Sequence, residues 1–241
     1  MRAVGIIGYK NSGKTTLVIA LARELIKRGH RVGTVKHASG GLDLLGGDTA
    51  KHRAVVEQAG AISSEESAVF FRGAKNLEEL LAHIDADFVL IEGFKEEKTF
   101  PKVVCLSGRD EDRALFDGLV LCAVGPEIPP EIAVPVFDPE RELGAIADLV
   151  EEKGFKLPNL NCGGCGVETC YNLARAIVEG TRNVSDCVSL RSTTEVRING
   201  TLMALSPFIG RIIARTIEGM LSALKGFRKG VIEIRIGGAG H

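Results

Sequence analysis

The sequence contains no tryptophan and only two tyrosines, and aromatic residues make up 5% of its 241 residues. It also lacks an excess of charge of either sign, because 30 lysines and arginines are balanced by 31 aspartates and glutamates, for a net charge of −1. This balance gives no electrostatic basis for wrapping nucleic acid, although a local basic patch remains compatible with it. We therefore expect no nucleic-acid partner.

Long apolar segments are missing as well. No apolar run approaches the roughly 18 residues needed to span a bilayer. The first residues, MRAVGIIGYKNSGKTT, lack the charged, apolar and cleavage-site segments of a secretory leader. We therefore expect a cytoplasmic protein without membrane association. In that compartment the six cysteines are expected to be reduced thiols or metal ligands rather than disulfides.

Short apolar runs alternate with helical patterns over the first part of the chain. Runs with the character of buried strands cover 3–8, 31–36, 68–71, 87–93, 102–106 and 119–124. Helical patterns cover 14–28, 47–58, 76–83 and 140–153. This alternation predicts an α/β fold, in which a mostly parallel sheet carries helices on both faces.

The character of the sequence changes at residues 153–161, KGFKLPNLN, which have the composition of a linker. We therefore predict one domain over 1–152 and a small α+β, cysteine-rich domain over 162–241. Within the second domain, a helix is expected near 168–180, and Asn199-Gly200 is expected to form a turn between two short strands.

The end of the chain adds one more helix and one more strand. Ser206-Pro207 have the residue types of a helix cap and first helical position, so a helix should run from there to about Leu224. Residues 231–236, VIEIRI, alternate like a half-buried strand. The apolar stripe of the helix is expected to belong to the core rather than to a membrane anchor; it consists of Phe208, Ile212, Ile213, Ile217, Met220, Leu221 and Leu224.

Residues 8–15, GYKNSGKT, match the phosphate-binding pattern G-x-x-x-x-G-K-[ST] at every fixed position. The glycines let backbone N–H groups turn towards phosphates, and the following helix adds the positive end of its dipole. Lys14 should reach the β- and γ-phosphates, and the Thr15 hydroxyl should ligate Mg²⁺. A predicted strand before the loop and a helix after it provide the context that the motif requires.

An acidic residue at the end of another strand should face the phosphates. Glu92 follows four apolar residues in FVLIEG and is the first candidate for the metal side of the site. Asp48 and Asp43 are second candidates, with an ordinary solvated carboxylate as the alternative for each. His37, at another strand end, either points into the site or has a structural role.

The sequence says less about which nucleobase the site recognises. No N-K-x-D or T-K-x-D box, which usually recognises guanine, occurs in the sequence. Asp110 in SGRDED could bind guanine, but a charged surface turn is the favoured interpretation. The residues alone do not distinguish GTP from ATP.

Four segments occur in the order seen in MobB proteins: GIIGYKNSGKTTL, VGTVKH, GGDTAKHR…AGA and DFVLIEGFK. Residues 1–150 thus resemble this family of P-loop GTP-binding proteins of molybdopterin guanine dinucleotide biosynthesis. The resemblance implies a P-loop NTPase domain, GTP and Mg²⁺ binding, slow hydrolysis and a homodimer. It also implies molybdopterin as the assisted substrate, and a MobA-type guanylyltransferase or molybdopterin-enzyme assembly proteins as partners. It places catalytic, metal-side roles on Asp48 and Glu92. The nucleotide contacts predicted from motif and resemblance are Gly8, Lys10, Asn11, Ser12, Gly13, Lys14, Thr15 and Thr16.

Cys162, Cys165, Cys170 and Cys187 are spaced C-x₂-C-x₄-C-x₁₆-C, which suits a soft-metal site. Glycines between them allow the backbone to fold around a cluster. Zinc sites with four cysteines usually show two paired knuckles, whereas the fourth cysteine here stands alone. CGGCGVETCYNLA resembles the small iron–sulfur domain of acetyl-CoA synthase/CO dehydrogenase subunits, which carries a [4Fe–4S] cluster. We therefore expect that cluster, with zinc or metal-free thiols as alternatives.

The other two cysteines, Cys105 and Cys122, lie inside apolar strand patterns and are expected to be plain core thiols.

Three functional hypotheses follow from these patterns. The leading one is a GTP-dependent accessory protein for guanylylation or insertion of a molybdenum or tungsten pterin cofactor. The second is an NTP-dependent metallochaperone that delivers a metal or cluster to an enzyme of the acetyl-CoA synthase type. The third is a scaffold in which nucleotide and cluster are both structural.

Overall fold

The computed structural model describes residues 1–38, 42, 47–73, 75–125, 133–191, 194–198, 201–203, 205–228 and 230–234. The chain forms two compact units, Met1–Lys156 and Leu157–His241. The division falls inside the segment that has the composition of a linker. Part of that segment is nevertheless packed, since the Phe155 side chain is buried in the first unit. The functional domain boundaries at 152 and 162 stay a prediction.

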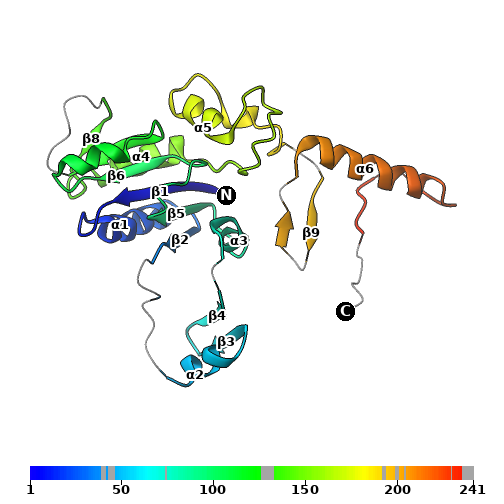
Figure 1. The fold of residues 1–241 in the computed structure, drawn as a ribbon, viewed down its shortest axis with the longest axis horizontal. Coiled ribbons are helices and arrows are strands. Elements are labelled where there is room, and N and C mark those ends of the chain that lie inside the picture. The colour runs from blue at the N-terminus through cyan, green and yellow to red at the C-terminus, as the bar shows by residue number, and fades with distance from the viewer. Residues whose placement is uncertain are drawn as a thin grey trace. The chain divides into compact units, whose positions relative to one another are not determined.

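A six-stranded parallel sheet forms the centre of the first unit (Figure 1), in the order β2-β5-β1-β6-β7-β8. Its strands are β1 (Arg2–Gly8), β2 (Val32–Lys36), β5 (Phe88–Glu92), β6 (Lys102–Cys105), β7 (Val120–Val124) and β8 (Val136–Phe137). Every residue of β5, β6 and β7 is buried, as expected for parallel strands covered on both faces. The predicted α/β fold is confirmed.

Helices cover both faces of this sheet. On one face, the apolar residues of α1 (Lys14–Lys27) and α4 (Leu143–Lys153) pack with Val4 and Ile6 of β1. On the other face, Ala3 of β1 packs with α3 (Leu77–Leu81). Ile7 packs near the 3-10 helix η1 (Asp110–Leu115). Alternate residues of β1 therefore belong to opposite layers of the core.

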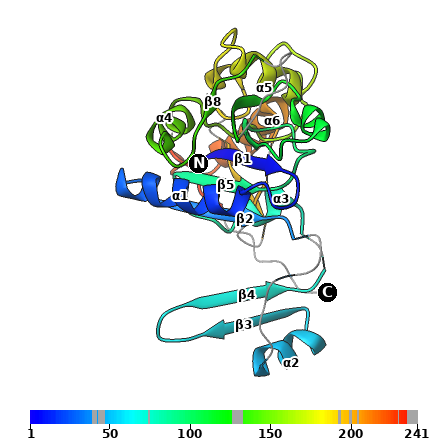
Figure 2. The same cartoon turned by 90° about the vertical axis from the view of Figure 1, so that its left-hand side faces the viewer.

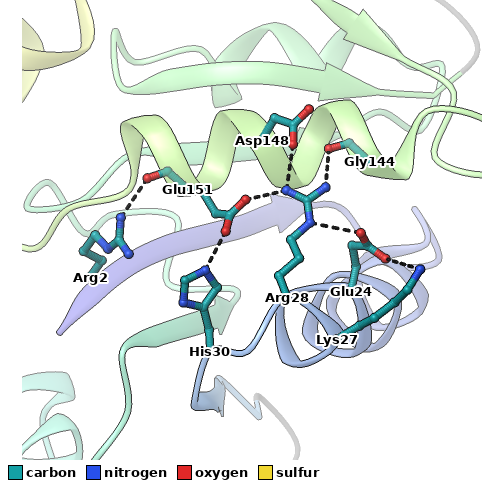
Figure 3. Close-up of polar contacts among 8 residues, drawn as sticks. All are labelled: Arg2, Glu24, Lys27, Arg28, His30, Gly144, Asp148 and Glu151. Atoms are coloured by element: carbon teal, nitrogen blue, oxygen red, sulfur yellow. Dashed lines mark hydrogen bonds and ion pairs between the residues drawn. The ribbon is translucent and has the colours of Figure 1, made fainter.

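A network of charges joins the end of α1 to α4 (Figure 3). Arg28 donates from Nε to Glu24 at 3.0 Å and from Nη1 to Asp148 at 2.6 Å, and it also pairs with Glu151. The second carboxylate oxygen of Glu151 lies 2.5 Å from Nε2 of His30. These groups fix the end of the helix that begins at the phosphate loop.

The segment between β2 and β5 differs from the sequence prediction. A helix was expected over 47–58, but α2 (Asp48–Val55) is shorter, and β3 (Gln58–Ile62) pairs with β4 (Ser67–Phe71) as a separate antiparallel sheet. Figure 2 shows this hairpin with α2 beside it. The chain reverses between β3 and β4 in a local turn, in which Ser63 Oγ accepts the N–H groups of Glu65 and Glu66. Strand β8 and helix η1 were also not predicted.

The second unit contains α5 (Cys170–Val178), the 3-10 helix η2 (Val184–Asp186), the antiparallel pair β9 (Val196–Ile198) and β10 (Thr201–Met203), and α6 (Pro207–Ser222). The predicted cap of α6 is confirmed, because Ser206 Oγ accepts the N–H of Ile209. The expected turn at Asn199-Gly200 lies outside the described residues.

Two expectations for the end of the chain are wrong. No strand forms over 231–234, and the described residues offer this segment no strand partner, without which an extended segment has no ladder; 235 and 236 lie outside the described residues. The α6 stripe is not a core, since Phe208 and Met220 are 63% and 69% exposed. No helix in the described ranges combines the length and apolarity needed to cross a membrane.

Candidate functional site

The loop between β1 and α1 is built around two glycines. A Cβ on Gly8 would collide with Ser12 Oγ and with the backbone oxygen of Cys105, so only glycine fits this approach to the neighbouring strand. Gly13 precedes α1 with φ of 82°, and Asn11 adopts φ of 65°. These left-handed residues curl the loop over the N-terminus of α1, which is the arrangement that presents N–H groups to an anion.

Two polar side chains of the loop, Lys14 and Ser12, are placed to bind a phosphate group. Lys14 Nζ donates to the backbone oxygen of Tyr9. The Ser12 hydroxyl oxygen is buried and has no hydrogen-bond partner among the described residues. A buried hydroxyl without a partner is costly, and a phosphate oxygen would satisfy it. The loop lines a cavity of about 970 Å³.

Glu92 meets the phosphate loop although it lies far away in sequence. Strand β5 pairs directly with β1, so that Glu92 is level with Ile6, and its buried carboxylate accepts the Thr15 hydroxyl at 2.8 Å. His37, from the neighbouring strand end, donates its backbone N–H to the Glu92 backbone oxygen at 2.9 Å and also lines the cavity. The two oxygen groups proposed for Mg²⁺ are therefore in contact.

All eight predicted nucleotide contacts of the loop line this cavity, and so does Glu92. Asp48 does not: it lies in the first turn of α2, where its exposed carboxylate pairs with Lys51 at 2.7 Å. Asp43 lies outside the described residues. Asp110 is exposed in η1, and the anchored carboxylate of that loop is instead Asp112, which accepts the N–H groups of residues 107–109.

Sequence reasoning missed a second set of cavity residues. These are Lys36, Gly93, Phe94, Lys95, Glu96 and Glu97. All follow or end strands β2 and β5, and the carboxyl ends of parallel strands are where ligands bind in open α/β sheets. That rule could have pointed to them, because KH lies at the end of the second strand and GFKEE follows the fifth.

The four clustered cysteines belong to the second unit, and two of them are buried. Cys170 begins α5: its N–H donates to Asn161 Oδ1 at 2.7 Å, and its Sγ accepts the Asn161 N–H at 3.4 Å. Burial raises the pKa of the Cys187 thiol, N–H groups of Leu190 and Ser189 oppose this, and the charges of other cysteines raise the pKa further. Two sulfurs are thus held by backbone N–H groups.

The other two thiols are more open. Cys162 is exposed and Cys165 is half-buried, on a loop where Gly163 has φ of 66° and Gly166 has φ of 83°. Across the described residues, no three or more His, Cys, Asp or Glu side chains are grouped so as to hold a metal ion. The donor set itself, thiolates with backbone N–H groups aimed at two of them, fits a thiolate-bound cluster.

A P-loop that joins the first strand and helix of a parallel sheet, with an acidic residue at the end of the adjacent strand, defines a P-loop nucleotide-binding protein. The chain belongs to the MobB family. The family model "Molybdopterin guanine dinucleotide synthesis protein B" matches residues 3–123. A second model, "Putative Fe-S cluster", matches residues 157–189, which include all four clustered cysteines.

Relatives support the same assignment. The chain is 30% identical, over 94% of its length and 93% of the relative's, to the "Putative molybdopterin-guanine dinucleotide biosynthesis adapter protein" of Methanocaldococcus jannaschii. It is 34% identical to the "Molybdopterin-guanine dinucleotide biosynthesis adapter protein" of Haemophilus influenzae, over 61% of this chain and 86% of that one. The crystal structure of Bacillus subtilis MobB superposes with a TM-score of 0.53 at 25% identity, over 63% of this chain and 97% of that one.

Proposed function

We propose that this protein is an adapter of molybdopterin guanine dinucleotide biosynthesis that binds GTP with Mg²⁺ at its phosphate loop. The observation that carries the proposal is the prepared loop, in which a buried Ser12 hydroxyl has no partner in the described part of the chain and Thr15 already meets Glu92. The adapter role rests on the family and on the names of its relatives.

Thr15 and Glu92 would hold the magnesium ion, since hydroxyl and carboxylate oxygens are the hard ligands that it prefers. When bound, Mg²⁺ neutralises charge on the β- and γ-phosphates. The chain itself supplies the backbone N–H groups of residues 11–16, the Lys14 ammonium and the Ser12 hydroxyl, all of which bind and orient the phosphates. Slow hydrolysis would suit an adapter that acts as a switch.

The cysteine-rich unit belongs to the same function, because the similarity to the archaeal relative extends over 94% of this chain. We propose that Cys162, Cys165, Cys170 and Cys187 would hold a [4Fe–4S] cluster, to which two buried and two more open thiols would contribute. The cluster would serve to dock a partner or to report the redox state. The cytoplasm, where thiols stay reduced, is the proposed compartment.

The proposed partners are a second copy of the chain and a MobA-type guanylyltransferase that acts on molybdopterin. The hairpin β3–β4 supports a homodimer, because Ile62 and Val69 on it are 88% and 63% exposed. A two-stranded sheet is at best marginally stable in water, so a second copy that covers these residues would stabilise it.

The test is titration of anaerobically purified protein with GTP and with ATP, each with Mg²⁺, and iron and acid-labile sulfide analysis of the same sample. Preference for GTP, about four iron atoms per chain and capture of a MobA-type guanylyltransferase are the expected results. Preference for ATP, or zinc in place of iron, would favour the metallochaperone or scaffold hypothesis. Lys14→Ala should abolish nucleotide binding; if binding persists, the phosphate loop is not the nucleotide site.

A further inference from the structure

A second lysine lies beside the phosphate loop. Lys95 is on the segment that follows β5, and it lines the same cavity as Lys14. Its ammonium nitrogen lies 3.6 Å from the centroid of the Tyr9 ring, a distance at which a cation and an aromatic face attract each other. The Tyr9 hydroxyl in turn donates to the Glu111 backbone oxygen at 3.1 Å, which holds the ring in place.

Lys14 and Lys95 thus converge on one residue. Lys14 donates to the Tyr9 backbone oxygen, while Lys95 covers its ring. Burial lowers the pKa of Lys95 and the charge of Lys14 lowers it further, whereas the charges of Asp112, Glu96 and Glu111 oppose this shift. Neither ammonium forms an ion pair with a carboxylate of the described residues. Two cations held close together repel each other unless an anion lies between or beside them.

The backbone of Lys95 is fixed from inside the protein. The side chain of Lys102, in β6, is fully buried, and its Nζ donates to the Lys95 backbone oxygen at 2.6 Å and to Asp117 Oδ2 at 2.6 Å. Burial lowers the pKa of Lys102, and the Asp117 carboxylate opposes that shift. Asp117 also accepts the Leu119 N–H at 3.2 Å. The net contribution of such an ion pair to stability is small, but Lys102 holds the Lys95 backbone in place.

We propose that Lys95 is a second phosphate-binding cation of the nucleotide site, which acts with Lys14 on the terminal phosphate of a nucleoside triphosphate. The proposal rests on the proposed nucleotide binding and adds a specificity to it. Because the terminal phosphate carries most of the added charge of a triphosphate, Lys95 distinguishes triphosphate from diphosphate. Lys102 and Asp117 are positioning residues, which act through the backbone of Lys95.

The test compares the dissociation constants of GTP and GDP, with Mg²⁺, for the wild-type chain and for Lys95→Gln. Loss of one charged hydrogen bond to the terminal phosphate should weaken GTP about tenfold or more and leave GDP nearly unchanged. Lys95→Arg should recover part of the discrimination. The matched control is Lys27→Gln, because Lys27 is an exposed lysine of α1 that does not line the cavity.

Asp117→Asn tests the positioning role and should lower the GTP-to-GDP preference in the same direction but less. Lys95→Gln keeps the inference testable if Asp117→Asn does not fold. An unchanged GTP-to-GDP ratio in Lys95→Gln, or equal losses for both nucleotides, overturns the inference and leaves the proposed function intact. If the wild-type chain binds neither nucleotide, both proposals are wrong.

Discussion

Replacing Ser12, whose hydroxyl has no partner in the described residues, should raise the stability of the nucleotide-free protein and weaken its binding of GTP. The hydroxyl oxygen is buried and has no hydrogen-bond partner within the described ranges, and an unsatisfied buried polar group costs about 1–3 kcal/mol. Ser12→Ala removes that group without adding volume. We therefore expect the nucleotide-free protein to become more stable by about 1 kcal/mol, which corresponds to a rise in Tm of about 2–4 °C for a chain of this size.

Nucleotide binding should change in the other direction. Without the hydroxyl, one phosphate oxygen loses a charge-assisted hydrogen bond of about 1.5–3 kcal/mol, so the dissociation constant of GTP should rise about tenfold or more. At a fixed, saturating GTP concentration, a tenfold weaker dissociation constant removes about 1.4 kcal/mol of stabilisation. The variant should therefore be more stable than wild type without GTP and slightly less stable with it.

Urea unfolding with and without GTP, together with titration calorimetry, measures both effects. The matched control is Ser63→Ala, because the Ser63 hydroxyl is fully engaged: it accepts the N–H groups of Glu65 and Glu66 and donates to a backbone oxygen. This variant should lose about 0.5–1 kcal/mol and keep its affinity for GTP. A destabilised nucleotide-free Ser12→Ala would show that the hydroxyl has a partner, and unchanged GTP affinity would remove it from the site.

Further predictions concern the thiols and the charge network. Burial raises the pKa of Cys105 and of Cys122 to about 12, so neither should react with a thiol reagent at pH 8 in the folded protein; rapid modification of either would contradict its place in the core. Asn161→Ala should destabilise the second unit by about 1 kcal/mol, because the Cys170 N–H loses its hydrogen-bond acceptor, and should lower the iron content; unchanged melting and iron content would show that this hydrogen bond is dispensable. The pKa of Glu151 is lowered by His30 and then Arg28. The ionised Glu151 carboxylate therefore stabilises the fold fully above its ordinary pKa of 4.5, and this contribution is lost as the pH falls through its lower pKa in the folded protein. In Glu151→Gln the free energy of unfolding, measured with urea, should therefore fall less steeply at acid pH. An equally steep fall would refute this prediction.

The phosphate loop and Glu92 could be found in the sequence because each depends on a local pattern. Glycines at fixed spacing prescribe the loop, and a carboxylate directly after a buried strand must emerge at the sheet edge. The sequence could not show that β5 lies next to β1, which is what brings Glu92 to Thr15. Strand order is set by long-range packing, whereas the pattern of a strand is set by its own residues.

The burial of Lys102, which fixes the backbone of Lys95, could not be predicted from the sequence. In the segment KVVCL, a lysine at the start of a strand suggests an exposed end, yet its side chain is completely buried. The burial is possible only because Asp117, fifteen residues later in the chain, supplies a carboxylate at 2.6 Å and the Lys95 backbone supplies an oxygen at the same distance. A charged residue is buried only where oppositely charged or hydrogen-bonding groups surround it. Hydropathy patterns carry no information on such groups when they are distant in sequence. The position of Lys95 beside Tyr9 depends on the same three-residue arrangement, so the second cation of the site becomes visible only once the fold is known.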